Sequence, residues 1–222
     1  MSAMIQFNEV TFGFNGASEL LFNKVTKVCE LFKLSMVIGR NGSGKSTFLK
    51  LFKADPSLLH ARVSGSFEAF GKSYTLLSQE HVRFVHEHIG YVDQKFDLLL
   101  APHLTFQENL ACAKFAHYPS LFSSVKTEEV PEIVHEFKIP FDQPVSLLSG
   151  GQRQILAILM SLQKNPAILL LDEPTAALDS KNAHMVMQFL VKLVEQEKVT
   201  VLMVCHDAEL YSYASGASLH LS

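Results

Sequence analysis

The chain has 222 residues, of which 48% are hydrophobic and 18% charged, and its mean hydropathy is +0.17. A chain of this length can bury a large core, and we expect one domain over residues 1–222. Its apolar runs fall far short of the roughly 18 residues that cross a bilayer, which argues against a membrane-spanning protein. The net charge of −3, without a long basic run, makes nucleic acid an unexpected partner.

The three cysteines, Cys29, Cys112 and Cys205, stand apart in apolar surroundings. They lack the paired spacing of a zinc site and the even count of a disulfide framework, which favours a reducing compartment. The N-terminus has no charged and apolar regions of a secretory signal. We therefore expect a cytoplasmic protein.

Two segments near the start predict strands of a small antiparallel sheet. Residues 4–14 and about 63–77 are rich in Phe, Val and Thr, and Gly65 and Gly71 mark turns. Three later apolar runs, at 34–38, 168–171 and 200–205, lack alternation and are typical of parallel strands buried on both faces. A turn and a helix-like pattern follow each of these runs, so the sequence predicts an α/β fold.

The segment after Asp179 and Ser180 predicts an amphipathic helix, because apolar residues recur there at intervals of three and four. The predicted buried stripe consists of Ala183, Val186, Met187, Leu190, Leu193 and Val194. The stretch of about 95–165 is also mostly helical in pattern. We expect a helical subdomain over about 95–164, inserted into a core formed by about 1–94 and 165–222.

Three polar or glycine positions directly follow the predicted parallel strands. They are Gly39, Asp172 and His206. Ligands of α/β folds bind at the carboxyl ends of parallel strands. We therefore expect these three positions to meet at one edge of the sheet.

A glycine-rich turn links the strand at 34–38 to the helical stretch at 48–52. It reads Gly39-Arg40-Asn41-Gly42-Ser43-Gly44-Lys45-Ser46-Thr47 and satisfies the phosphate-loop pattern. The backbone N–H groups of such a loop point at an anion, and the helix that follows adds the positive end of its dipole. Lys45 can then reach the β and γ phosphates, and the Ser46 hydroxyl can bind Mg²⁺. The alternative is a glycine-rich turn with an incidental lysine.

Two adjacent acids, Asp172 and Glu173, end the apolar run at 168–171. A charge at the end of a buried strand needs a partner, and a Mg²⁺ ion held by Ser46 would supply one for Asp172. Glu173, pointing the other way, would position and polarise the water that attacks the γ-phosphate. The alternative is that both acids are solvated loop residues.

A second glycine turn, Leu148-Ser149-Gly150-Gly151-Gln152, precedes a helix-like stretch at 153–163. Ser149 and the glycine N–H groups predict a second anion site at a helix N-terminus. This turn has no lysine and lies in the predicted helical subdomain. If one nucleotide needs both turns, two chains must meet head to tail, and two-fold symmetry then creates two sites.

This combination of motifs resembles the ATP-binding subunits of ABC transporters, whose signature turn also reads Leu-Ser-Gly-Gly-Gln. The resemblance covers essentially the whole chain and implies a P-loop NTPase core with a mostly parallel sheet, an N-terminal antiparallel β subdomain and an inserted α-helical subdomain. It also implies ATP and Mg²⁺ as ligands, with ATP hydrolysed to ADP and phosphate.

The resemblance assigns roles to further residues. Phe14 matches the aromatic ring that stacks on adenine, and Gln94 matches the glutamine that touches Mg²⁺ and water and senses the membrane partner. Asp179 lies in the loop that crosses the dimer interface, and His206 matches the histidine that contacts the γ-phosphate. The implied catalytic residues are Lys45, Gln94, Glu173 and His206, the metal ligands Ser46, Gln94 and Asp172, and the nucleotide contacts Phe14, residues Gly39 to Thr47, residues Ser149 to Gln152, and Asp179.

The sequence departs from the family pattern at several positions. Phe14 replaces the usual tyrosine, and Arg40 and Asp93 stand where proline is common. The Gly-Glu turn ahead of the phosphate-loop strand is absent, and Leu31-Phe32-Lys33 stands there. None of these changes removes a group that the chemistry needs, so we expect hydrolysis to be intact.

Two other segments are candidates for binding a ligand or a partner. His81, His86 and His88, with Glu87, form a weak candidate metal site that lacks a cysteine or a further acid nearby. The apolar stretch 98–106 is a candidate docking surface for a short helix of a membrane partner, and its alternative is buried helix packing.

We expect an ATP-hydrolysing subunit that energises transport through separate transmembrane subunits at the cytoplasmic face of the inner or plasma membrane. A second copy or a homologous ATPase would complete a head-to-tail dimer. The alternatives are a non-transporter ABC-type ATPase in DNA repair or translation, and a nucleotide sensor without turnover. The transported substrate and the direction of transport stay open.

Overall fold

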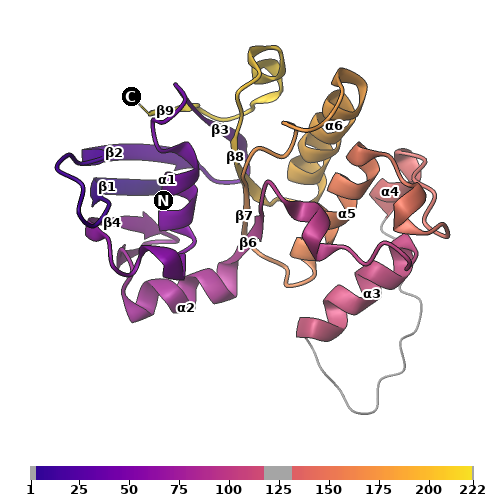
Figure 1. Cartoon of the computed structure of the whole chain (residues 1–222), viewed down its shortest axis with the longest axis horizontal. Helices are drawn as coiled ribbons and strands as arrows, with labels where there is room; N and C mark the ends of the chain where they lie inside the picture. Colours follow the sequence, from indigo (N-terminus) through magenta and orange to yellow (C-terminus); the bar gives the residue numbers. More distant parts are fainter. Residues whose placement is uncertain (1–3, 118–131, 222) are drawn as a thin grey trace.

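The computed structural model describes residues 4–117 and 132–221, so part of the predicted helical segment, at 118–131, lies outside the described residues. Figure 1 shows the antiparallel strands on one side, the parallel strands in the middle and the longer helices of the second half of the chain on the other side. Within the two described stretches, no helix combines the length and apolarity that crossing a bilayer requires.

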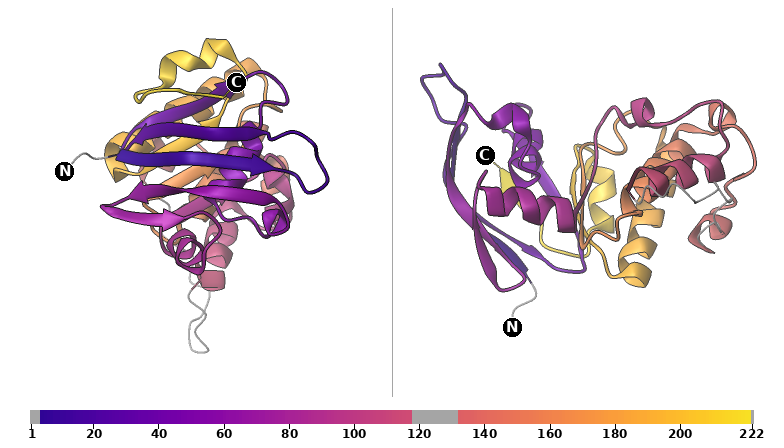
Figure 2. Two further views of the ribbon diagram at one scale, coloured as in Figure 1. Left: turned by 90° about the vertical axis from the view of Figure 1, so that its left-hand side faces the viewer. Right: turned by 90° about the horizontal axis from the view of Figure 1, so that it is seen from below.

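The antiparallel sheet has the strand order β2-β1-β4-β5. Its strands are β1 (Met4–Gly13), β2 (Phe22–Glu30), β4 (Arg62–Ala69) and β5 (Lys72–Thr75). The strands predicted at 4–14 and 63–77 are therefore confirmed, whereas β2 was not predicted. β2 is an edge strand that lies beside β1, on the side away from β4 (Figure 2, left). It carries several exposed polar residues, so its apolar signal in the sequence is weak.

The parallel sheet has the order β6-β7-β8-β3-β9, and the pairs within it are parallel. Its strands are β3 (Leu34–Gly39), β6 (Ile89–Val92), β7 (Ile168–Leu171), β8 (Thr200–Val204) and β9 (Leu219–Leu221). The three predicted parallel strands are confirmed. The sequence did not reveal β6 and β9, because strands of four and three residues carry little periodicity.

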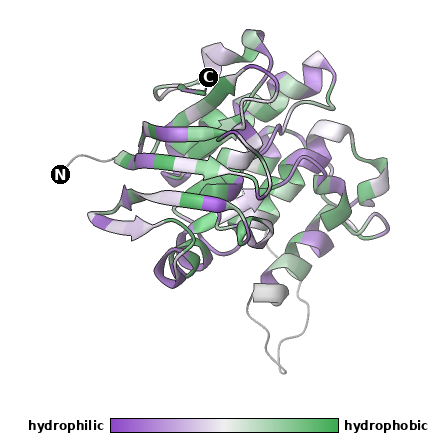
Figure 3. Ribbon diagram, turned by 60° about the vertical axis from the view of Figure 1, so that its left-hand side comes forward, coloured by the Kyte–Doolittle hydropathy of each residue, from purple (hydrophilic) through white to green (hydrophobic). Residues whose placement is uncertain are grey.

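The parallel strands bury both of their faces, as the sequence predicted. Along β7, Leu169 and Leu171 join the core that packs against the helices, whereas Ile168 and Leu170 join the core beneath the antiparallel sheet. The ring of Phe7, on β1, packs in that second core against the Phe48 ring with centroids 4.7 Å apart. Figure 3 shows mixed hydrophilic and hydrophobic segments along the antiparallel strands, which have one solvent face.

Six α-helices lie in the described ranges. They are α1 (Lys45–Phe52), α2 (Gln79–His88), α3 (Phe106–His117), α4 (Glu132–Glu136), α5 (Gly150–Leu162) and α6 (Ser180–Glu197). Four short 3₁₀ helices are η1 (Pro56–Leu58), η2 (Phe96–Leu99), η3 (Val145–Leu147) and η4 (Ala208–Tyr213). Between β8 and β9 the structure has the 3₁₀ helix η4, where the sequence predicted a helix-like pattern.

The longest helix confirms its prediction in detail. Asp179 is the N-cap of α6, and its side chain accepts a hydrogen bond from the Asn182 N–H. The six predicted stripe residues are all buried in the core against α5 and the parallel sheet. α5 and α6 pack side by side, and their N-terminal ends meet where the Ser149 hydroxyl bonds to Asn182.

Candidate active site

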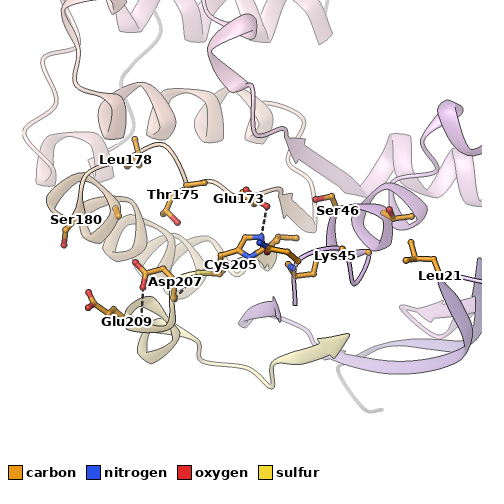
Figure 4. Close-up of a pocket in the computed structure, with 18 of the residues that line it drawn as sticks. Leu21, Lys45, Ser46, Glu173, Thr175, Leu178, Ser180, Cys205, Asp207 and Glu209 are labelled. Atoms are coloured by element: carbon orange, nitrogen blue, oxygen red, sulfur yellow. Dashed lines mark hydrogen bonds and ion pairs between the residues drawn. The ribbon is translucent and has the colours of Figure 1, made fainter. Parts of the chain in front are cut away.

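A cleft of about 1070 Å³ lies at the carboxyl ends of β3, β7 and β8 (Figure 4). These strands are neighbours in the parallel sheet, so the turns that follow them share one edge. Nine of the predicted site residues line the cleft: Phe14, Asn41, Gly42, Gly44, Lys45, Ser46, Thr47, Glu173 and His206.

The glycine-rich turn between β3 and α1 forms one wall of the cleft. Gly44 is the N-cap of α1 with φ +89, a conformation that favours glycine, and a Cβ there would lie 2.7 Å from Cζ of Phe22. Nζ of Lys45 donates hydrogen bonds to the carbonyls of Gly39 and Arg40, at 3.0 and 2.9 Å. The buried ammonium thus lies within the loop, next to the free N–H groups of the helix N-terminus.

Ser46 and Asp172 meet behind the loop. The Ser46 hydroxyl donates to Oδ1 of Asp172 at 2.8 Å, and Asp172 is only 6% exposed. Burial raises the pKa of the Asp172 carboxyl, because desolvation penalises its charged form. A hydroxyl and a buried carboxylate are oxygen ligands of the kind that Mg²⁺ takes when phosphates complete its coordination, so this pair fits the ion.

Glu173 is contacted through both of its carboxylate oxygens. Nε2 of Gln94 donates to Oε2 at 2.9 Å, and Nε2 of His206 lies 2.7 Å from Oε1. Glu173 also has φ +52, a left-handed conformation that is rare for a side chain with a Cβ and that concentrates at functional sites. Gln94, Glu173 and His206 follow three different strands, β6, β7 and β8, so the sheet brings them together.

The second glycine turn lies outside this cleft. Ser149 is the N-cap of α5: its hydroxyl accepts from the Gln152 N–H, and Oε1 of Gln152 accepts from the Ser149 N–H. Neither these residues nor Gly150, Gly151 and Asp179 line the cleft of their own chain. The structure therefore brings together only the first of the two predicted half-sites.

Asn182 links the second turn to the loop before α6, and sequence reasoning missed it. The Ser149 hydroxyl donates to Oδ1 of Asn182 at 3.0 Å, and Nδ2 of Asn182 donates to Oδ2 of Asp179 at 2.8 Å. The Asn182 N–H bond lowers the pKa of the Asp179 carboxyl. The signal could not be local, because Ser149 and Asn182 are 33 residues apart in the chain.

Phe14 also lines the cleft. Its ring is 51% exposed and packs edge-on against Phe12, with centroids 4.9 Å apart. Leu21, which sequence reasoning did not single out, lines the cleft as well (Figure 4). An exposed ring and an aliphatic side chain at the mouth of a cleft can pack against a planar group.

The histidine cluster does not form a metal site. The His81 ring is fully buried: its Nδ1 accepts from the Leu77 N–H at 3.0 Å, and its Nε2 lies 2.9 Å from the Phe52 carbonyl. Both nitrogens are thus occupied by the backbone. The part of the chain that the structure describes contains no group of three His, Cys, Asp or Glu side chains placed to hold a metal ion.

The apolar stretch 98–106 divides into exposed and buried residues. Leu98 is 81% and Leu99 60% exposed on η2, whereas Leu100 and Phe106 are buried. Leu98 and Leu99 are therefore the exposed leucines of the predicted docking surface. A third leucine, Leu147 on η3, is 70% exposed.

Comparisons with known proteins agree on one family. The family model described as "ABC transporter" matches residues 22–176. The phosphonates import ATP-binding protein PhnC 1 of Ruegeria sp. (strain TM1040) is 30% identical over 200 residues, which cover 86% of this chain and 76% of that protein. The methionine import ATP-binding protein MetN 3 of Shouchella clausii (strain KSM-K16) is 31% identical, and the match covers 87% of this chain but 54% of that protein.

Solved structures are similar over nearly the whole chain. A bacterial ABC transporter cassette solved as a dimer superposes with a TM-score of 0.74 at 28% identity, covering 97% of this chain and 94% of that one. A dimeric cassette in a post-hydrolysis state, bound to ADP and Pi, gives a TM-score of 0.72 at 26% identity, with 98% and 96% covered. These similarities confirm the predicted α/β fold with its P-loop core.

Proposed function

Because this chain belongs to the ABC transporter family of ATP-binding proteins, we propose that it hydrolyses ATP in the cleft of Figure 4 and that Glu173 is the general base. One observation carries this proposal: Glu173 lines the same cleft as the phosphate loop, with Gln94 and His206 on its two carboxylate oxygens. A carboxylate so placed can accept the proton of a water that attacks the γ-phosphate.

The phosphate loop binds the triphosphate. Lys45 exchanges the carbonyls of Gly39 and Arg40 for β- and γ-phosphate oxygens, and the N–H groups at the N-terminus of α1 donate to the phosphates. Ser46 and Asp172 hold Mg²⁺, together with Gln94. When bound, Mg²⁺ neutralises charge that develops on the phosphate oxygens.

His206 and Phe14 complete the nucleotide contacts. His206, 2.7 Å from Glu173, donates a hydrogen bond to the γ-phosphate and so distinguishes ATP from ADP. Phe14, which lines the cleft with half of its ring exposed, stacks on the adenine.

The Ser149 turn serves the nucleotide of a second copy or of a homologous ATPase. Its residues lie outside their own cleft at the N-terminus of α5, and similar cassettes are solved as dimers. Ser149, Gly150, Gly151 and Gln152 then face the partner's γ-phosphate, with Asp179 at the interface. In this arrangement residues 1–94 and 165–222 form the nucleotide-binding core, and residues 95–164 form the helical subdomain that carries the turn.

The chain acts at the cytoplasmic face of a membrane, on separate transmembrane subunits. Leu98 and Leu99, four and five residues beyond Gln94, offer them exposed apolar side chains, as does Leu147 on η3. Relatives are named for phosphonate import, methionine import and macrolide export, so we assign this chain neither a cargo nor a direction.

The test of the general base is Glu173→Gln, which keeps the shape and removes the proton acceptor. We expect the rate of phosphate release to fall about 10²- to 10⁴-fold while ATP still binds, so that ATP-bound dimers accumulate. Glu197→Gln, the same chemical change at the exposed end of α6, is the matched control. Undiminished phosphate release by Glu173→Gln would refute the assignment.

The test of the shared site is Ser149→Arg in the Glu173→Gln chain. The bulky cation should block ATP-dependent dimerisation, measured by size-exclusion chromatography, yet leave ATP binding by the monomer intact, because Ser149 does not line its own cleft. A double variant that dimerises normally with ATP would contradict the head-to-tail arrangement.

A further inference from the structure

Arg153 occupies an unexpected place in the first turns of α5. A cation near a helix N-terminus is opposed by the helix dipole, and the first turn of α5 carries no acid to balance it. Two acceptors compensate for this: Nε of Arg153 donates to Oδ1 of Asp97 at 3.0 Å, and NH1 donates to the Leu148 carbonyl at 2.8 Å. The planar guanidinium therefore joins two separate segments.

The two segments contain residues with roles in different nucleotide sites. Asp97 lies on η2, three residues beyond Gln94, whose amide contacts Glu173 in this chain's own cleft. Leu148 directly precedes Ser149, which caps α5 outside that cleft. One side chain thus connects the segment that contacts the catalytic carboxylate to the turn that we assign to the partner's nucleotide.

The two segments that Arg153 connects also share a hydrophobic core. Phe96 of η2 and Leu148 are both buried in the core that contains the apolar face of α5. The Arg153–Asp97 ion pair is more exposed than this core, with side chains 31% and 56% exposed. Exposed ion pairs contribute little to folding stability, so the value of this one lies in fixing the relative position of the two segments.

We propose that Arg153 is a positioning residue that couples Gln94 to the Ser149 turn of the same chain. The inference rests on the proposed function, because it requires that the turn serve the partner's nucleotide. When Gln94 shifts toward Mg²⁺-ATP in its own cleft, Asp97 shifts with it, and Arg153 carries that displacement to Leu148 and Ser149. Closure at one nucleotide then favours closure at the other, and linkage makes the effect reciprocal.

The experiment removes the guanidinium in the full chain that also carries Glu173→Gln. Arg153→Ala should leave the ATP affinity of the monomer within about twofold, because Arg153 does not line its own cleft. The dissociation constant of the ATP-bound dimer should rise about tenfold, or about 1.4 kcal/mol. With Glu173 restored, the Hill coefficient for ATP hydrolysis should fall toward 1. Arg153→Lys keeps the charge but can reach only one acceptor. Its dimer dissociation constant should lie between those of the Glu173→Gln chain with and without Arg153→Ala.

Two further variants separate coupling from general damage. Asp97→Ala removes the same bridge from the exposed side and should weaken the dimer as Arg153→Ala does, and the double variant should be no worse than either single one. Lys192→Ala breaks the ion pair between α6 and Glu136 of α4, which involves neither segment. This variant is the matched control and should leave dimerisation unchanged.

The outcomes distinguish this inference from the proposed function. If the Glu173→Gln chain dimerises with ATP and adding Arg153→Ala or Asp97→Ala changes nothing, the coupling role is refuted and the ATPase assignment stands. Equal losses for Lys192→Ala and Arg153→Ala would also refute it. If the Glu173→Gln chain hydrolyses ATP normally and never dimerises, the general base and the shared site of the proposed function are both refuted, and the inference falls with them.

Discussion

The buried histidine of α2 offers a sharp test of the packing beneath the antiparallel sheet. His81 is fully buried, with its Nδ1 accepting from the Leu77 N–H and its Nε2 next to the Phe52 carbonyl. These two bonds require the neutral ring protonated on Nε2. Burial accordingly lowers the pKa of His81 from its ordinary value, because desolvation disfavours the imidazolium.

His81→Ala removes both bonds together with the ring, which packs against Phe67 with centroids 4.8 Å apart. A buried backbone group left without a partner costs about 1–3 kcal/mol, so two such losses give about 2–6 kcal/mol near pH 7.5. Domains are stable by about 5–15 kcal/mol, so the variant should be folded but clearly weakened.

The difference between the two chains should depend on pH, and the lowered pKa fixes the sign. Below roughly pH 6.5 the unfolded chain binds a proton on His81 while the folded chain does not, so the free energy of unfolding falls. This loss reaches up to about 1.4 kcal/mol per pH unit until the pH passes the lower pKa of the folded state. His81→Ala lacks this group, so the gap between the two chains should narrow as the pH falls.

The assay is urea unfolding followed by far-ultraviolet circular dichroism, because the chain has no tryptophan. Free energies of unfolding are compared at pH 8, 7, 6 and 5 for the unsubstituted chain, His81→Ala, and the exposed control His103→Gln. A stability difference between the unsubstituted chain and His81→Ala that stays constant from pH 8 to 5 would refute the reasoning. It would also be refuted if His103→Gln removed the pH dependence of the free energy of unfolding to the same extent as His81→Ala.

Three further outcomes follow from single contacts. Phe14→Ala should raise the dissociation constant of a fluorescent ATP analogue about tenfold, since stacking on a base contributes about 1–3 kcal/mol, and Phe14→Tyr should not. Gly151→Ala should lower the free energy of unfolding by about 1–3 kcal/mol, against the usual preference for alanine in helices, because the new Cβ would lie 2.6 Å from Cε of Met185 and 2.9 Å from Oδ1 of Asn182. A higher free energy of unfolding in a urea titration would contradict this. Asp172→Asn should raise the thermal midpoint of the ligand-free chain at pH 7, because it removes a buried charge whose pKa burial raises, while Mg²⁺-dependent ATP binding is lost; a lowered midpoint would contradict the burial penalty.

The motifs that identify the family could be read directly from the sequence, because their geometry is local. The phosphate loop needs glycines and a lysine at fixed spacing between a strand and a helix, and residues 39–47 provide them without any distant contact. The N-caps Ser149 and Asp179 bond to groups three residues away in the chain. The double burial of β7 is likewise visible as an unbroken apolar run.

The tertiary structure alone decided which of these residues touch. Gln94 and Glu173 are 79 residues apart, and Arg153 and Asp97 are 56 apart, so no periodic pattern connects them. The same holds for His81, whose nearby histidines suggested a metal until its two nitrogens proved to bond to the backbone. Spacing along the chain determines hydrogen bonds within a turn, whereas contacts between turns depend on the order β6-β7-β8-β3-β9 in which the strands assemble, and that order is set by the packing of the whole core.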